Sequence, residues 1–192
     1  MARPREFDIE QAREDAMNVF WDGGYKGTSL PDLLDSLGLS RGSLYKAFDS
    51  KRSLFVEALL LYDKTVLQPG VALLKDGRII SGESRIEKFF DYAVDRAEAG
   101  DRRGCLLCNA AVGAAHDDRE IGTIVARMFK ELTSGIEVAL QDTSKFSTAT
   151  DEERVAKANG ITMIYVGLRV LVRSGAEITQ LRNSVNGMLS EL

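Results

Sequence analysis

Two cysteines in this sequence have a spacing that could do chemistry. Cys105 and Cys108 stand in C-L-L-C, directly after Asp-Arg-Arg-Gly. A helix would carry both sulfurs on one side, near its N-terminus. Arg102, Arg103 and the helix dipole would favour the thiolate, which is the reactive form of cysteine. These are the conditions for a reactive cysteine, which could serve redox or electrophile sensing, but inert packing in an apolar helix is the preferred interpretation.

A second set of polar side chains lies between Thr28 and Lys51, in TSLPDLLDSLGLSRGSLYKAFDSK. Arg41 could reach guanine O6 and N7 with its donor fork, and Gly42 would let the backbone approach a base edge. The hydroxyls and cations around them suit phosphate oxygens. Thr28 and Lys51 open two helices, where free N–H groups favour an anion. The predicted DNA contacts are Thr28, Ser40, Arg41, Gly42, Ser43, Tyr45, Lys46 and Lys51.

A helix-turn-helix is the arrangement that would position these side chains. Thr28 is a good N-cap, and leucines at helical spacing follow it as far as Leu37. Gly38 then suits the left-handed conformation that ends a helix. Ser40 caps a second helix running to about Phe48, in which Leu44 faces the core. The first helix would pack against the second and support it, and the second would present polar side chains to a DNA groove.

The run S-R-G-S-L-Y-K-A-F-D-S-K-R-S-L-F, residues 40–55, resembles the DNA-reading signature of the TetR/AcrR family of bacterial transcriptional regulators. G-S-L-Y-x-x-F-x-S-K is much more specific than a bare helix-turn-helix pattern. Ala47 departs from it, since many members carry histidine there. The resemblance implies a ligand-responsive repressor that acts in the bacterial cytoplasm, on the nucleoid when DNA-bound.

Composition and charge are compatible with this function. A hydrophobic content of 44% and a charged content of 28% are those of a globular protein. The net charge is −4, but the cations of residues 41–52 give a local basic face that is sufficient for phosphate contacts. No signal peptide is expected, and the most apolar stretch, 160–172, is interrupted by Arg169 and too short for a membrane span. Two cysteines cannot form a disulfide scaffold, which predicts a reducing cytoplasm.

The periodicity predicts an all-α fold of about nine helices. Asp8 and Gln11 form a capping box for the first helix, which Gly23-Gly24 ends. Arg3 and Arg5 flank Pro4 in a short basic arm that is either frayed or placed in a minor groove. A DNA-binding domain is expected at 1–52 and a second helical domain at 53–192. A helix at about 50–67 links them, and Pro69-Gly70 breaks the helical pattern after it. Further helices are expected at 86–97, 105–115, 121–136, 151–173 and 178–192.

The resemblance also implies what the second domain does. In the family this domain dimerises through its last two helices and encloses a small-molecule pocket, so the expected partners are an operator duplex, a second copy of the chain and an unknown inducer. Apolar spacing on the last helix predicts a dimer seam of Ile178, Leu181, Val185 and Met188. The candidate pocket residues, each also explicable as core packing, are Tyr62, Phe89, Phe90, Tyr92, Cys108, His116, Phe129 and Tyr165.

Other function classes fit the sequence less well. A thiol-disulfide oxidoreductase would need a strand before the two cysteines, and helical pattern precedes them instead. A zinc site would need two further ligands beside the single histidine. An architectural DNA-binding protein would hardly need a separate helical domain of this length. The sequence therefore predicts a homodimeric transcriptional regulator with no enzymatic activity, no cofactor and no metal.

Overall fold

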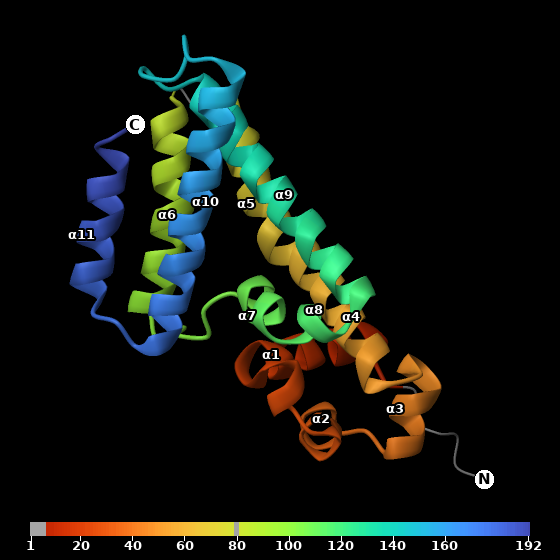
Figure 1. The fold of residues 1–192 in the computed structure, drawn as a ribbon. Coiled ribbons are helices and arrows are strands. Elements are labelled where there is room, and N and C mark those ends of the chain that lie inside the picture. The colour runs from red at the N-terminus through yellow and green to blue at the C-terminus, as the bar shows by residue number, and fades with distance from the viewer. Residues whose placement is uncertain (1–6, 79–80) are drawn as a thin grey trace.

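A computed structural model describes residues 7–78 and 81–192, and helices are its only regular elements in those ranges (Figure 1). The predicted basic arm around Pro4 falls outside them. The helices are α1 (Ile9–Gly27), α2 (Leu30–Leu37), α3 (Arg41–Phe48), α4 (Lys51–Tyr62), α5 (Gln68–Lys75), α6 (Gly82–Glu98), α7 (Leu106–Val112), α8 (Ala114–Asp117), α9 (Arg119–Gln141), α10 (Asp151–Ser174) and α11 (Ile178–Leu189). The all-α fold is confirmed.

The helices are more numerous than expected because two predicted elements are divided differently. The predicted break at Pro69-Gly70 is wrong, since a π-helical turn, Asp63–Leu67, joins α4 to α5 without a loop. In that turn the Gln68 N–H donates to the Asp63 carbonyl, and Pro69 then falls in the first turn of α5, where its missing N–H costs little. The predicted helix at 105–115 is divided at Gly113 into α7 and α8.

Local signals set the helix ends in the N-terminal head, α1 to α3. The Asp8 carboxylate caps α1 as expected, by accepting hydrogen bonds from the backbone of residues 10 and 11. Gln11 donates instead to Asp15, so the predicted capping box does not form. Gly24 kinks α1 with a φ of 70°, and Gly38 ends α2 with a φ of 61°. Both angles are left-handed and favour glycine.

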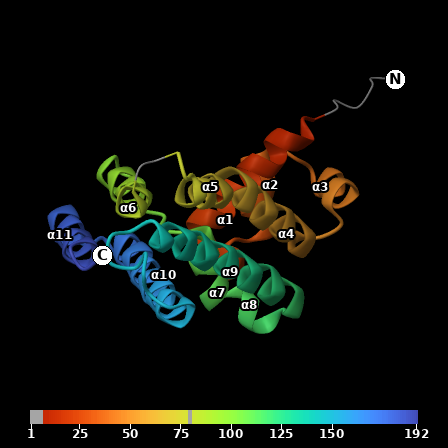
Figure 2. The same cartoon turned by 90° about the horizontal axis from the view of Figure 1, so that it is seen from above.

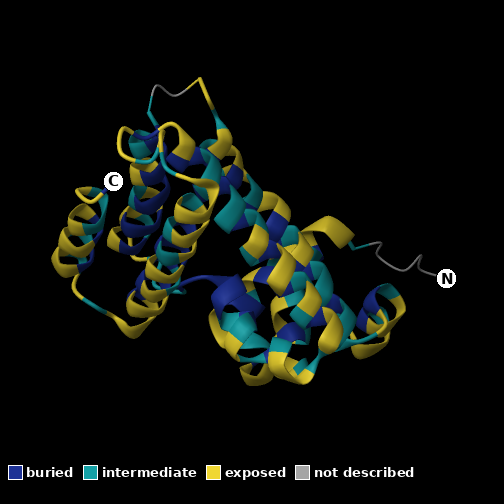
Figure 3. Cartoon of the chain, turned by 45° about the horizontal axis from the view of Figure 1, so that its top comes forward, coloured by how far each residue is buried: buried dark blue, intermediate teal, exposed yellow. Residues whose placement is uncertain are grey.

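The remaining helices form a bundle in which α9 lies between α5 and α10 (Figures 1 and 2). The helix α6 contacts α5, α9 and α10, and α11 lies against α6 on the outer side. Buried residues line the facing sides of these helices (Figure 3). Arg85 of α6 is also fully buried, where it pairs with Asp142 and donates to the Leu74 carbonyl.

The helix α10 is the one described helix that is long and apolar enough to cross a membrane by length and composition alone. Its Ala158, Ile161, Leu168 and Val172 side chains are buried within the bundle. A core helix passes the same test of length and composition, but only 33% of the apolar window of α10 is buried within the chain, so one face of this helix remains exposed.

The closest approach of α6 to α9 depends on Gly82. A β-carbon at this position would lie 1.8 Å from the Ala139 carbonyl oxygen. Gly82→Ala should therefore force α6 away from α9 and lower the free energy of unfolding by about 3 kcal/mol, measured by urea denaturation. Gly27→Ala is the matched control, because nothing lies within 4 Å of its added carbon. Equal stabilities of the two variants would contradict this packing.

Candidate functional site

The helix α3 presents a polar face to solvent. Its N-cap is Ser40, whose hydroxyl accepts a hydrogen bond from the Ser43 N–H at 3.1 Å. Leu44 and Phe48 are buried and fix the opposite face in the head. The exposed residues of the helix include Arg41, Gly42, Tyr45 and Lys46. The structure thus brings together most of the predicted DNA contacts on one free surface.

Two short-range interactions arrange the side chains on α3. The Arg41 guanidinium carbon lies 5.8 Å from the centre of the Tyr45 ring, so the two side chains interact through a cation–π contact. The hydroxyls of Ser40 and Ser43 are 2.9 Å apart and share a hydrogen bond. Both serines stay close to the helix N-terminus, where unpaired N–H groups favour a phosphate.

Thr28 does not belong to this surface, which corrects one predicted contact. Its side chain is buried, and its hydroxyl donates to the Gly24 carbonyl at 2.8 Å. Ser29 caps α2 in its place, in a capping box with Asp32. A threonine one residue before the cap satisfies a carbonyl of the kinked α1 and is not available to a phosphate.

Lys51 keeps its charge near the surface, at the start of α4. Its ammonium nitrogen lies 4.5 Å from the centre of the Tyr25 ring, and the side chain is half-buried. Desolvation lowers the pKa of Lys51, and Asp32 partly opposes this effect. A cation that is already partly desolvated loses less on contact with a phosphate than a fully hydrated one.

The neighbouring cation Arg52 is used inside the protein. Its Nη2 donates to Asp118 at 2.9 Å and to Glu120 at 2.7 Å, at the start of α9. The Arg52 guanidinium lowers the pKa of the Asp118 carboxyl to about 2. Lys26 forms a similar ion pair with Asp117. Because Arg52 belongs to the predicted basic face, that face is smaller than the sequence suggests.

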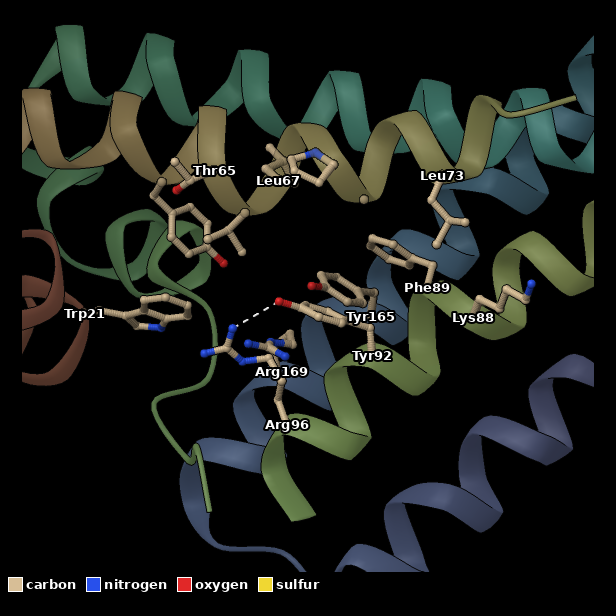
Figure 4. A pocket seen from close by; sticks show the side chains of 14 residues that line it. Trp21, Thr65, Leu67, Leu73, Lys88, Phe89, Tyr92, Arg96, Tyr165 and Arg169 are labelled. Carbon is tan, nitrogen blue, oxygen red and sulfur yellow. Dashed lines mark hydrogen bonds between the residues drawn. The ribbon is translucent and has the colours of Figure 1, made fainter. Parts of the chain in front are cut away.

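A cavity of about 270 Å³ lies between the head and the bundle (Figure 4). Its wall comes from α1, the α4–α5 helix, α6 and α10. Tyr62, Phe89, Tyr92 and Tyr165, four of the eight predicted pocket residues, are among its lining residues. The other lining residues are Trp21, Thr65, Val66, Leu67, Pro69, Gly70, Leu73, Lys88, Arg96 and Arg169.

The other four predicted pocket residues lie elsewhere. Phe90 is fully buried and packs edge-to-face against Tyr165 at 5.7 Å between ring centres. Cys108 and Phe129 line a separate hollow between α7, α9 and α10. His116 is exposed on α8. Helical spacing identifies apolar faces, but it does not distinguish a face that closes on the core from one that borders a cavity.

Three important residues of the cavity were missed from the sequence. Trp21 contacts Tyr62 edge-to-face at 4.8 Å and donates to the Gly104 carbonyl at 3.3 Å. Arg96 donates to the Tyr92 hydroxyl at 3.0 Å and pairs with Asp101. Arg169 is buried at the same site. They come from α1, α6 and α10, and no local pattern links them.

Comparisons with known proteins agree with this architecture. A profile described as "Bacterial regulatory proteins, tetR family" matches residues 13–58, which cover most of the head and the start of α4. A solved structure of a cysteine mutant of the TetR-family transcriptional regulator CifR, complexed with a 26-base-pair operator DNA, superposes with a TM-score of 0.85. It is 28% identical, over 98% of both chains.

The head matches the DNA-binding module of the tetR family, and the whole chain has the fold of the TetR-family regulator CifR. Two further relatives are similar in sequence. YezE of Bacillus subtilis strain 168, an uncharacterized HTH-type transcriptional regulator, is 28% identical over the full length of both chains. BdcR of Escherichia coli K12, an HTH-type transcriptional repressor, is 35% identical over 105 residues, which are 55% of this chain and 53% of BdcR. The protein is a DNA-binding transcriptional regulator and not an enzyme.

The two cysteines are buried, and Cys105 lies against the cavity residue Tyr62. Cys105 is 2% exposed and Cys108 is 5% exposed. The Cys105 sulfur lies 3.2 Å from the Tyr62 hydroxyl. Its neighbour Cys108 and the Arg169 cation lower the pKa of Cys105 to about 6, although burial opposes them. Cys105 and burial raise the pKa of Cys108.

The charge that acts on Cys105 was expected from the two arginines before it, and this expectation is wrong. Arg102 donates to the Ala176 carbonyl at 2.7 Å. Arg103 bonds Asp101 and Asn18, and its guanidinium stacks on Trp21. Both side chains are engaged elsewhere because the segment before α7 is extended rather than helical.

The predicted dimer seam on α11 needs a correction as well. Leu181 is 1% exposed and Val185 is 2% exposed, because α11 packs this face against α6. Ile178 and Met188, at the ends of the seam, are half-buried. The apolar repeat packs α11 against its own protomer. Leu181 and Val185 are therefore not exposed for contact with a partner helix.

The exposed face of α3 generates a prediction for Arg41 and Lys46, tested on a duplex that the wild-type protein selects from a random pool. Arg41→Ala should cost about 1–3 kcal/mol of binding and relax preference at one base position. Lys46→Ala should weaken binding to all duplexes and reduce the salt dependence, because one phosphate contact is lost. Fluorescence anisotropy over a salt series measures both.

Lys130→Ala is the control for this experiment, since Lys130 is a cation on α9, outside the head. It should change neither affinity nor salt dependence. Equal and salt-independent losses from the Arg41 and Lys46 variants would mean that α3 is not the helix in the groove.

Proposed function

We propose that this protein is a homodimeric repressor, which binds a palindromic operator through α3 and leaves it when a small molecule enters the cavity beside Trp21. It acts in the bacterial cytoplasm, on the nucleoid when DNA-bound. The observation that carries the proposal is the position of Trp21, which belongs to the head helix α1 and lines the cavity. A ligand in the cavity would therefore touch the DNA-binding head directly.

In this proposal the domain at 1–52 binds DNA, and the domain at 53–192 binds the ligand and dimerises. Ser40, Arg41, Gly42, Ser43, Tyr45, Lys46 and Lys51 would contact DNA. CifR, with which the chain superposes over nearly its whole length, was solved in complex with operator DNA. One head offers few contacts, whereas a two-fold dimer reads two half-sites about 34–36 Å apart.

Coupling between the cavity and the head would pass through hydrogen bonds from an arginine side chain of α10 to the backbone of α1. Arg173 of α10 donates to the Trp21 carbonyl at 3.2 Å and to the Asp22 carbonyl at 2.7 Å. The Arg103 guanidinium lies 4.1 Å from the centre of the Trp21 ring. A ligand that displaces this ring would shift α1 relative to α10. The two heads of a dimer would then no longer match the half-site spacing, which releases the DNA.

The dimer interface that we propose is the outer face of α10. Met163 is 70% exposed, and Val170 lies two turns further along the same helix and is also exposed. A β-carbon added at Gly160 or Gly167 would meet no atom within 4 Å, so a second helix could approach closely there. An apolar stripe with small residues in a protein of this size is typical of a helix–helix interface.

The exposed stripe predicts that Met163→Arg separates the protomers. The charge would be buried without a partner in a dimer, but it would be hydrated in a monomer. Analytical ultracentrifugation should show a monomer of native helicity. Its affinity for a palindromic duplex should fall to that for a single half-site, and repression of a reporter gene behind that duplex should be lost.

Leu60→Arg is the matched control, because Leu60 is an exposed leucine on α4, away from α10. This variant should remain dimeric and repress normally. A Met163→Arg protein that sediments as a dimer would refute an interface on this face of α10.

A second candidate function is sensing by the Cys105 thiol. Its lowered pKa favours this function, as does its contact with the Tyr62 hydroxyl at the cavity wall. An electrophile in the cavity would then alkylate the Cys105 sulfur, and Cys108 would resolve an oxidised form as a disulfide. The burial of both sulfurs opposes this function, because a thiolate reacts only where a reagent can reach it.

Burial predicts that both thiols resist a brief pulse of iodoacetamide at neutral pH in the native protein. Intact-protein mass spectrometry should show no adduct, whereas the urea-unfolded chain should gain two. Rapid native labelling at Cys105 alone would instead support the thiol sensor. In that case Cys105→Ser would stay on DNA under oxidant, and Cys108→Ser would be released but recover poorly.

A further inference from the structure

The cavity contains a buried cation without a counter-charge. Arg169 is 6% exposed, and its Nε is buried with no hydrogen-bond partner in the described part of the chain. One Nη donates to the Gly104 carbonyl. Within residues 7–78 and 81–192, no carboxylate lies within ion-pair distance of this guanidinium. A desolvated charge in this position is costly unless an anion approaches it.

Other well-shielded arginines of this protein show what Arg169 lacks. Arg85 pairs with Asp142, and Arg154 pairs with Asp151. Arg96, which lines the same cavity, pairs with Asp101. The groups whose charges act on Arg169 are instead the weak acids Tyr165, Cys105, Tyr62 and Cys108. The cavity therefore has one buried cation without an ion pair, Arg169, beside a paired one, Arg96, whereas its third cation, Lys88, is exposed to solvent.

Apart from Thr65 and the exposed Lys88, the rest of the cavity wall is aliphatic or aromatic. The rings of Phe89 and Tyr165 lie 4.7 Å apart at 37°, and Trp21 forms the opposite part of the wall in the view of Figure 4. Gly70 is confined by the Phe89 ring, which a β-carbon would approach to 2.9 Å. The volume of about 270 Å³ is just below the range of ligand pockets, which are about 300–1,000 Å³. These walls suit one flat ring with a short substituent.

We propose that the effector is a small aromatic carboxylic acid, bound with its carboxylate on Arg169 and its ring against Tyr165 and Phe89. The inference rests on the proposed function, because it names the ligand of the same cavity. A guanidinium can donate two parallel hydrogen bonds to a carboxylate, which gives both affinity and orientation. A neutral ligand of the same shape would fill the cavity but leave the Arg169 charge uncompensated.

Cys105 is the internal competitor for this cation. As a thiolate it would supply part of the counter-charge, and the Arg169 cation helps to lower its pKa. Binding of a carboxylate and ionisation of Cys105 therefore oppose each other, and by linkage each weakens the other to the same degree.

The test uses Trp21, which is the only tryptophan of the chain and lines the cavity. Benzoate, phenylacetate and cinnamate are titrated against the dimeric wild-type protein, each beside its uncharged amide. We expect at least one acid to quench Trp21 fluorescence saturably, with an affinity at least tenfold above that of its amide. Calorimetry on the same pairs provides an independent reading.

Three variants assign the preference to Arg169. Arg169→Gln should reduce the ratio of acid to amide affinity to about one, whereas Arg169→Lys should retain part of it. Arg96→Gln is the matched control from the same wall, and it should keep the preference because that arginine is already engaged in an ion pair with Asp101. Far-ultraviolet circular dichroism and binding of the amides verify that each variant keeps its cavity.

Two results would overturn the inference. One is that no acid of the panel binds the wild type more tightly than its amide does. The other is that Arg169→Gln keeps the full preference. Release of DNA is measured separately on the selected duplex. Acids that bind with an Arg169-dependent preference but leave the DNA complex intact would uphold the ligand class and refute the proposed function.

Discussion

The junction between the head and the bundle depends on Trp21, whose side chain packs between them. This indole packs edge-to-face on Tyr62, lies beneath the Arg103 guanidinium and donates its N–H to the Gly104 carbonyl. A single side chain thus joins α1 to α4, to α6 through Arg96, and to the segment before α7. Because the same ring lines the cavity, neither the head nor the cavity can change shape without the other.

Ion pairs reinforce this junction at the other edge of the head. Arg52 and Lys26 pair with Asp118 and Asp117 at the corner between α8 and α9. These pairs remove two cations from the set available to DNA. They also fix the start of α4, on which α3 rests. The basic face that remains is small, and its position on one exposed helix matters more than the total charge of an acidic protein.

The two arginines that line the cavity differ in whether a carboxylate pairs with them. Arg96 is paired with Asp101, while the charges that act on Arg169 come from weakly acidic groups. Gly104 belongs to the same arrangement, since it has a φ of 70° and its carbonyl accepts hydrogen bonds from both Trp21 and Arg169. A change in the charge state around Arg169 would therefore act on an atom that also holds Trp21.

Much of this protein follows from local sequence. Capping residues, Gly38 and the apolar spacing from Leu30 to Phe48 determine a helix-turn-helix with Arg41, Tyr45 and Lys46 outward, because these signals act within one or two turns. The all-α class follows in the same way. The same local reasoning misassigned Thr28, whose hydroxyl bonds a carbonyl of the preceding helix.

Tertiary structure alone decided the rest. The seam of Leu181 and Val185 is apolar whichever helix covers it, and only the position of α6 shows that it is filled within the protomer. The cavity joins residues as far apart as Trp21 and Arg169, so no periodicity could indicate it. Whether a charge is paired depends on which distant carboxylate folds beside it, and spacing along one helix contains no information about that contact.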